Sequence, residues 1–514
     1  MLPSLNPIPS FPAYTGPYKV GSTEIEIPIS EIPSESPVPD PKITSIKFRA
    51  FYPTTSDATS KKSVSWLPEP HKESLAGLIS FSGASARLQK ILSLFPNILS
   101  HVDIPAVRDA PLLSRSSKQP VVIFSHGLGG NANAYSSICG NLASCGIVAF
   151  APEHRDGSCP VAYAKTKRSS SVSSAYKVPY QKHAHRPDPE ILDARNKQLR
   201  IRLWELELLY SAINALNEGK HFKTYSRSNP PSFKSTLDLS RGKVTWAGHS
   251  FGGATVVQFV KSIFYHESLP TPPEADTDDW TPLYRPSSNH TLLSQITPQS
   301  PLVLLDLWTM PLRGYLTEWL WERPLPCYSN PDNPTSNVLA IMSTEFTKYT
   351  ELLIRMKALL SAEPVVTLAK LESLSEARSE SESQSQSTGQ SKSQEQFQNQ
   401  LPTPDTSSTT SSSSAITLTN TSNEPLLFTT PHSAHLSQSD FGPLFPYLNR
   451  RFLKVDDPHA KIQINTRAIL QAMRMCGVEV GSVRGEKLEE AKGWDEQVLG
   501  GGEVGGLRRL GLDI

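Results

Sequence analysis

Six short apolar runs, each bounded by turn-forming residues, constrain the fold of this 514-residue chain more than any other feature of its sequence. They are Pro120–Ser125, Ile147–Ala151, Lys243–Ala247, Pro301–Leu305, Asn337–Met342 and Pro425–Thr429. Near-continuous Val, Ile and Leu are typical of strands that are covered on both faces. Helical patterns lie between the runs, most clearly in Ile191–Asn217, where apolar residues recur every three or four positions. Strands alternating with helices predict an α/β protein with a mostly parallel central sheet flanked by helices.

A serine-rich segment interrupts this pattern. Residues 371–424 hold 16 serines in 54 positions, and Leu, Ile, Val and Phe together number six there. Such a composition cannot bury enough apolar surface to offset the entropy lost on ordering. We therefore expect a disordered insert at residues 375–422 and a flexible, glycine-rich tail at residues 501–514. Residues 1–374 and 423–500 are then predicted to form a single domain.

The net charge and the absence of certain motifs limit the classes of partner and cofactor that we expect. Fifty Lys and Arg against 49 Asp and Glu leave a net charge of +1, which offers no polycationic face to nucleic acid. The sequence has no apolar run of 18 residues and no recognisable signal peptide, so we expect no transmembrane segment and a cytoplasmic location. It also lacks His-Glu-x-x-His, Cys-x-x-Cys and EF-hand patterns, and we predict neither a metal ion nor a cofactor.

The sharpest motif is Gly248–Gly253, which directly follows one of the apolar runs and precedes a helical stretch. A serine between glycines at a strand-to-helix turn is typical of a nucleophile held in a strained conformation with its hydroxyl presented outward. The alternative is a plain glycine-rich turn. The placement favours Ser250 as the nucleophile, and Phe251, the residue after it, as one backbone donor to an oxyanion hole.

The α/β-hydrolase fold orders its triad as serine, then an acid, then histidine, with the partners at strand ends. Asp306 closes the run Pro301–Leu305, where an unpaired carboxylate is costly to bury; the alternative is a solvated loop residue. His432 and His435 both follow the last apolar run, and local pattern does not choose between them.

A second glycine cluster, Ser125–Gly130, follows the first apolar run. Glycines at this place let a backbone N–H approach the substrate and complete the oxyanion hole. The charged stretch Glu153–Asp156 precedes the serine, which breaks the triad order, so we interpret it as part of the wall of the site.

The chain resembles the platelet-activating-factor acetylhydrolase family of the plasma and type II intracellular kind. The resemblance is carried by FSHGLGG (124–130), APEHRDGS (151–158), GHSFGGAT (248–255) and LDLWTMPL (305–312), with support from GPYKVG (16–21) and 193–206. It implies an α/β-hydrolase fold and a calcium-independent serine esterase that removes short or oxidised sn-2 acyl groups from phospholipids. It also implies that Ser250 is the nucleophile, Asp306 the acid, and Leu128 and Phe251 the oxyanion donors.

The resemblance also chooses between the two histidines. In the family the histidine lies five residues before an Asp-Phe pair, and Asp440-Phe441 places it at His435. His435 is followed by Leu436, where the family usually has a polar residue.

Two other functions are compatible with the sequence. One is a general short-chain carboxylesterase, lipase or polyester hydrolase; the other is a catalytically silent lipid-binding homologue. The expected partner is a phospholipid presented at a membrane or lipoprotein surface, which would make the protein peripherally membrane-bound. The amphipathic stretch Leu88–Leu99 would either contact lipid or pack on the core.

Overall fold

The computed structural model describes residues 9–34, 36–56, 63–83, 98–166, 175–270, 281–329, 337–388, 425–481, 498–499 and 506–512. Within α9 its side chains are described as far as Arg378. The predicted helix at Leu88–Leu99 lies almost wholly outside these ranges. None of the described helices combines the length and the apolar character needed to cross a bilayer.

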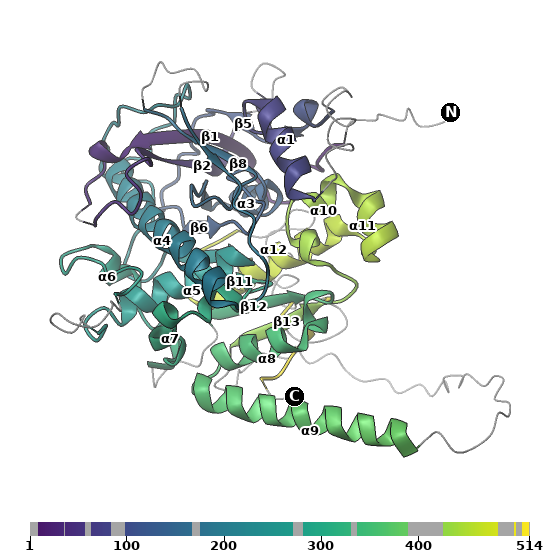
Figure 1. Cartoon of the computed structure of the whole chain (residues 1–514). Coiled ribbons are helices and arrows are strands. Elements are labelled where there is room, and N and C mark those ends of the chain that lie inside the picture. Colours follow the sequence, from purple (N-terminus) through teal and green to yellow (C-terminus); the bar gives the residue numbers. More distant parts are fainter. Residues whose placement is uncertain are drawn as a thin grey trace, which may run out of the picture.

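One ten-stranded sheet organises the fold, in the order β14-β13-β12-β11-β10-β6-β7-β2-β1-β5 (Figure 1). Its strands are β1 (Lys19–Pro28), β2 (Ser45–Thr54), β5 (Val107–Arg108), β6 (Val121–Ser125), β7 (Val148–Pro152), β10 (Thr245–His249), β11 (Leu302–Leu305), β12 (Val338–Ser343), β13 (Leu426–Thr430) and β14 (Arg508–Arg509). The six strands from β7 through β6 to β13 run parallel, and β2 and β14 join them antiparallel. Two small antiparallel sheets of two strands each pair β3 (Val64–Ser65) with β4 (Asp103–Ile104) and β8 (Val161–Ala164) with β9 (Tyr176–Pro179).

Helices cover both faces of the sheet. The helices of the described residues are α1 (His71–Phe81), α3 (Ser136–Ser144), α4 (Pro189–Glu218), α5 (Phe251–Phe264), α6 (Leu292–Gln295), α7 (Tyr315–Trp321), α8 (Thr350–Leu359), α9 (Pro364–Thr388), α10 (Phe441–Leu444), α11 (Pro446–Leu453) and α12 (Pro458–Met475). Successive residues of each central strand enter opposite cores. Ile123 packs with α4 and α5, whereas Val122 and Phe124 pack with α3 and α12. This double covering explains the near-continuous apolar runs, and the predicted α/β class with a mostly parallel, helix-flanked sheet is confirmed.

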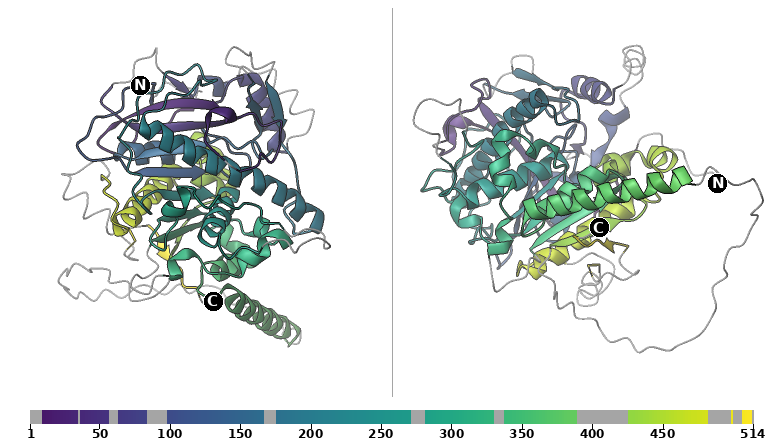
Figure 2. Two further views of the ribbon diagram at one scale, coloured as in Figure 1. Left: turned by 90° about the vertical axis from the view of Figure 1, so that its left-hand side faces the viewer. Right: turned by 60° about the horizontal axis from the view of Figure 1, so that its bottom comes forward.

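Part of the predicted disordered insert is helical. Helix α9 continues to Thr388, so the prediction of disorder is wrong for residues 375–388, while residues 389–424 lie outside the described ranges (Figure 2). Leu371 is buried, and Arg355 of α8 pairs with Glu372 at 3.2 Å, which anchors the first turns. Once a helix is nucleated, Glu, Gln and Arg extend it at little cost, and composition alone does not show this.

The predicted flexible tail at residues 501–514 also contains ordered chain. Strand β14 pairs with β13, and Leu507 is buried. Without β14, β13 would be an open sheet edge with unpaired backbone groups, so covering it supplies the hydrogen bonds that order this stretch.

Candidate active site

The turn between β10 and α5 presents Ser250 in a strained conformation. Its φ of 56° and ψ of −117° lie outside the regions that a serine normally adopts. The flanking glycines make this turn possible, because a Cβ on Gly252 would lie 2.0 Å from the Ser125 carbonyl oxygen and one on Gly248 would lie 2.3 Å from the Gly252 oxygen. The predicted strand–serine–helix turn is therefore present, and Ser250 lines a cavity.

Asp306 and His435 meet at the carboxyl end of the sheet. Asp306 follows β11, is fully buried, and its Oδ2 lies 3.0 Å from Nδ1 of His435, the first residue of a 3₁₀ turn after β13. Ser343, at the end of β12, donates to the same carboxylate through its hydroxyl (2.7 Å) and its backbone N–H (2.5 Å). These donors compensate for burying the carboxylate and fix its orientation.

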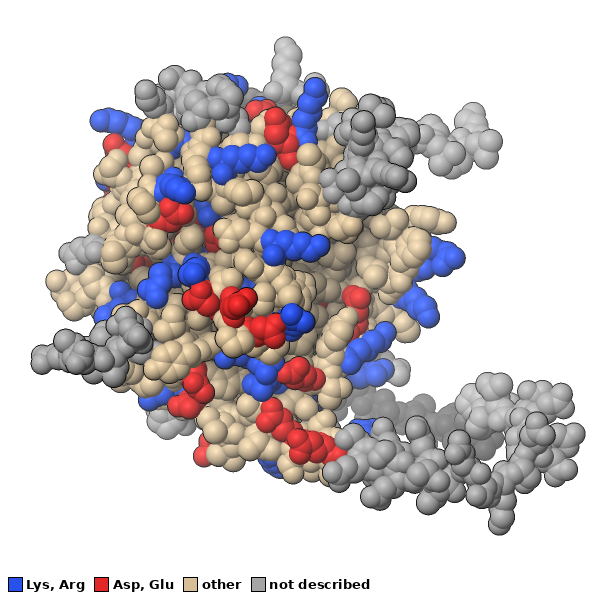
Figure 3. Space-filling model, in the orientation of Figure 1, with Lys and Arg blue, Asp and Glu red and all other residues tan. Residues whose placement is uncertain are grey.

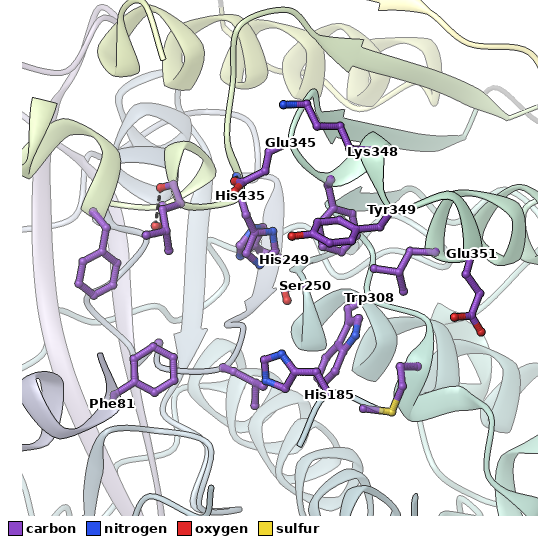
Figure 4. A pocket seen from close by; sticks show the side chains of 18 of the residues that line it. Phe81, His185, His249, Ser250, Trp308, Glu345, Lys348, Tyr349, Glu351 and His435 are labelled. Atoms are coloured by element: carbon purple, nitrogen blue, oxygen red, sulfur yellow. Dashed lines mark hydrogen bonds between the residues drawn. The ribbon is translucent and has the colours of Figure 1, made fainter. Parts of the chain in front are cut away.

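Two rings pack against the His435 ring. Phe346 stacks on it at 4.9 Å between centroids, and the His249 ring lies 4.4 Å away on a tilted plane. The backbone N–H of His435 also donates to the Glu345 carboxylate at 2.9 Å. Figure 4 shows the His249 and His435 rings close together beside Ser250.

His432 has a different environment. Its side chain is 71% exposed, and its nearest charged partner is Asp456 at 4.0 Å. Of the two histidines that local sequence pattern could not separate, the structure brings His435 and not His432 to Asp306.

In the glycine cluster after β6, the amides of the three glycines are paired. Gly127 N–H donates to the Tyr135 hydroxyl, Gly129 N–H to the Ser158 carbonyl and Gly130 N–H to the Gly127 carbonyl. Within the described part of the chain, Leu128 N–H has no acceptor. Phe251 is the first residue of α5, so its N–H has no acceptor within the helix either. Among the described residues, neither predicted oxyanion donor has a backbone acceptor.

The cavity beside Ser250 has a volume of about 760 Å³. Its lining is mainly apolar and includes Phe81, Trp308 and Phe346. Of its charged residues, Lys348 and Glu351 lie at the edge of the cavity (Figure 4). This combination suits an apolar group near the serine with polar groups further out.

One group among the described residues has the composition of a metal site. Ligand atoms of His249, Asp306 and His435 lie within 4.8 Å of one another. However, Nδ1 of His435 already bonds Asp306, and Ser343 donates to the same carboxylate, so two of the three candidate ligands are engaged in hydrogen bonds. The donor set fits a hydrogen-bonded network better than a cation.

The residues around the triad candidates include several that sequence reasoning did not identify. Ser343 could have been found by the rule used for Asp306, because it is a polar residue closing an apolar strand. Phe346, Tyr135 and Arg202 gave no local signal, since their roles depend on packing between distant segments.

The stretch Glu153–Asp156 does not line the cavity. It is buried beneath the loop after β6, where His154 contacts the Ser125 hydroxyl at 2.9 Å and Glu205 at 2.8 Å. Burial, followed by the charge of Arg202, holds the pKa of His154 well below its ordinary value. A neutral buried histidine of this kind is a structural link rather than a proton carrier.

The parallel sheet, the Ser250 turn and the Asp306–His435 pair at later strand ends together correspond to the α/β-hydrolase fold. The model of the family "Platelet-activating factor acetylhydrolase, isoform II" matches residues 5–496. The chain belongs to this family, one of carboxylic ester hydrolases, and the resemblance found in the sequence is confirmed.

Curated relatives match part of the chain. A "Putative phospholipase A2" of Schizosaccharomyces pombe is 31% identical over 48% of this chain and 57% of its own. The "Platelet-activating factor acetylhydrolase" of Cavia porcellus is 33% identical over 48% of this chain and 52% of its own length. The protein of the same name from Bos taurus is 35% identical over 41% of this chain and 45% of its own length. The chain thus spans about half the length of these relatives. Among solved structures, a ferulic acid esterase from Streptomyces cinnamoneus covers 91% of this chain and 90% of its own, with a TM-score of 0.38 and 12% identity.

Proposed function

We propose that this protein is a calcium-independent serine esterase that hydrolyses short or oxidised sn-2 acyl groups of phospholipids through an acyl-Ser250 intermediate. The observation that carries the proposal is the 3.0 Å contact between the buried Asp306 carboxylate and Nδ1 of His435 beside a cavity that Ser250 lines. Family membership supports the ester chemistry.

The mechanism follows from these contacts. Because Nδ1 of His435 is bound to Asp306, Nε2 is the nitrogen that accepts the proton of the Ser250 hydroxyl as Ser250 Oγ attacks the ester carbonyl. The resulting oxyanion accepts hydrogen bonds from the amides of Leu128 and Phe251. His435 then gives the proton to the departing glycerol oxygen. Water hydrolyses the acyl-serine by the same steps, which releases the acid and restores Ser250.

Exposed apolar side chains beside the cavity support a lipid surface as the source of substrate. Helix α11 follows α10, whose Phe441 lines the cavity, and exposes Tyr447, Leu448 and Phe452 by 76%, 56% and 68%. Its last turn also carries Arg450 and Arg451. An amphipathic helix that combines apolar and basic side chains is suited to the interface of a phospholipid membrane. Elsewhere, on the face shown in Figure 3, basic and acidic side chains are interspersed.

Labelling with a fluorophosphonate tests the chemistry. Wild-type protein should be labelled and Ser250→Ala should not; an unlabelled wild type would favour the silent lipid-binding alternative. Activity should persist in EDTA. A panel of phospholipids from 2-acetyl to 2-palmitoyl, compared with p-nitrophenyl esters, tests the substrate. Rapid turnover of p-nitrophenyl esters without turnover of 2-acetyl phospholipid would favour a general esterase, lipase or polyester hydrolase.

Vesicle flotation tests the surface. The double variant Tyr447→Ser/Phe452→Ser should lose binding to phosphatidylcholine–phosphatidylglycerol vesicles while keeping its activity on a water-soluble ester. Tyr315→Ser is a matched control, because Tyr315 is 67% exposed on α7, away from α11 in Figure 1. Equal binding by the double variant and the control would show that α11 is not the contact.

A further inference from the structure

Arg202 of α4 is a fully buried cation at the junction of several segments. Its Nε lies 2.6 Å from Asp156, which balances the charge, and its Nη2 donates to the Ser158 hydroxyl at 2.6 Å. Its Nη1 donates to the His126 carbonyl at 2.8 Å. A planar guanidinium can bond in these separate directions, which a lysine ammonium on a flexible stem cannot reproduce.

The contacts of Arg202 reach both chain segments that carry the oxyanion donors. Arg202 binds the loop after β6 directly at the carbonyl of His126, two residues before Leu128. It also binds this loop indirectly through Ser158, whose hydroxyl accepts from Arg202 and whose carbonyl accepts from Gly129 N–H at 2.9 Å. On the serine turn, its Cζ lies 4.3 Å from the centre of the Phe251 ring.

A further bond fixes the same helix end, since Nη1 of Arg202 lies 3.3 Å from the Thr255 hydroxyl. That hydroxyl donates to the Phe251 carbonyl at 2.9 Å. The loop itself is held independently by Tyr135, whose hydroxyl accepts from Gly127 N–H at 3.1 Å. Leu128 and Phe251 therefore belong to segments that are each restrained, and Arg202 is a side chain that touches both.

We infer that Arg202 is a positioning residue that sets the separation of the Leu128 and Phe251 amides, and so the fit of the oxyanion hole to the transition state. The inference rests on the proposed function. A positioning role for Arg202 differs from a purely structural role in its effect on the kinetics. An oxyanion hole binds charge that develops only in the transition state, so its distortion lowers kcat and leaves KM nearly unchanged.

The matched pair for the test is Arg202→Lys and Arg195→Lys. Arg195 is also buried on α4 and packs over the Phe251 ring at 5.7 Å, but it bonds Gln198 rather than the loop after β6. The assay measures kcat and KM on p-nitrophenyl acetate, and the inhibition constant of a trifluoromethyl ketone. Ser250 Oγ adds to the ketone carbon, its proton passes to His435, and the ketone oxygen becomes an oxyanion.

Removing one oxyanion donor outright costs about 10²–10³ in kcat, so a displaced donor should cost about 10- to 100-fold. We expect that loss in Arg202→Lys, with KM within about twofold and a matching rise in the ketone inhibition constant. Arg195→Lys should change kcat, KM and the ketone inhibition constant by less than about twofold relative to the wild type. Unchanged kcat in a folded Arg202→Lys, an equal loss in Arg195→Lys, or unchanged ketone inhibition would overturn the inference.

A milder variant keeps the test decisive if Arg202→Lys does not fold. Ser158→Ala removes one partner of Arg202 and leaves the Ser158 carbonyl that holds Gly129. It should lower kcat by about three- to tenfold at constant KM, and an unchanged kcat would refute the positioning role. Failure of the proposed function is distinguishable, because wild-type protein would then resist fluorophosphonate and hydrolyse no ester.

Discussion

Replacing the two neighbouring histidines separates the catalytic base from a bystander. His435→Ala removes the group proposed to take the Ser250 proton, and triad members act as a unit, so kcat/KM should fall by roughly 10⁴-fold or more. The same change removes one of the three hydrogen bonds to the buried Asp306 carboxylate. Losing a bond to a buried charged group costs about 1–3 kcal/mol, so the variant should also melt at a lower temperature.

His432 supplies the matched control. Its side chain is 71% exposed, and its charged neighbour among the described residues, Asp456, is 4.0 Å away and itself exposed. Such an exposed pair contributes little to stability. Its φ is 48°, which Asn tolerates better than Ala, so His432→Asn is the appropriate substitution. We expect a loss of less than about tenfold in kcat/KM.

The assay is hydrolysis of one short-chain ester near pH 8, repeated with added imidazole. Imidazole should restore part of the turnover in His435→Ala, because a small base can enter the space that the ring vacates, and should have no effect on His432→Asn. An inactive His432→Asn beside an active His435→Ala would refute the assignment and leave Ser250 and Asp306 without this base.

Three further predictions test the serine turn and the insert. Ser250→Ala should lower kcat by at least about 10³ with an unchanged circular dichroism spectrum; comparable turnover would contradict the proposed chemistry. Gly252→Ala should abolish activity and lower the melting temperature strongly, because the new Cβ would lie 2.0 Å from the Ser125 carbonyl oxygen of the neighbouring strand; a stable, active variant would show that the turn can relax. Deleting residues 389–422 should change the melting temperature by less than about 2 °C, since loop length has little effect on closure entropy; a large loss of stability would show that the segment packs.

The sequence predicted the central strands well and the first two poorly. Strands β6, β7 and β10 to β13 appear as apolar runs because both of their faces are covered by helices. Strands β1 and β2 are buried as well, yet β1 contains Thr23 and Glu26, which hide it from a search for apolar runs. Glu26 is only 1% exposed and is compensated by the Ser45 hydroxyl at 2.8 Å and Arg155 at 3.1 Å. Such pairing depends on residues far away in the sequence.

Some residues of the candidate site can be recognised in the sequence, and others cannot. Ser250 and Asp306 are recognisable because each ends a strand and is an unusual residue at that place. The stacking of Phe346 on His435 and the reach of Arg202 to two loops carry no such local mark. Sequence reasoning therefore named groups that would perform the chemistry, but not the groups that hold them in place.

Hydrogen bonds of the sheet stabilise the strained backbone conformations at the candidate site. Ser250 and Asp306 have φ values of 56° and 41°, and each directly follows a strand. Strain of this kind costs about 1–3 kcal/mol per residue and persists only where its surroundings enforce it. Here Ser250 N–H donates to the Leu305 carbonyl at 2.8 Å and Asp306 N–H to the Ile341 carbonyl at 2.9 Å, so each strained residue continues the hydrogen bonding of its strand to the next strand along. Because β10, β11 and β12 are parallel, these bonds stack the strained residues at one edge of the sheet. The position of the serine relative to the acid is thus set by strand register, which explains how residues 56 positions apart in the sequence can share one site.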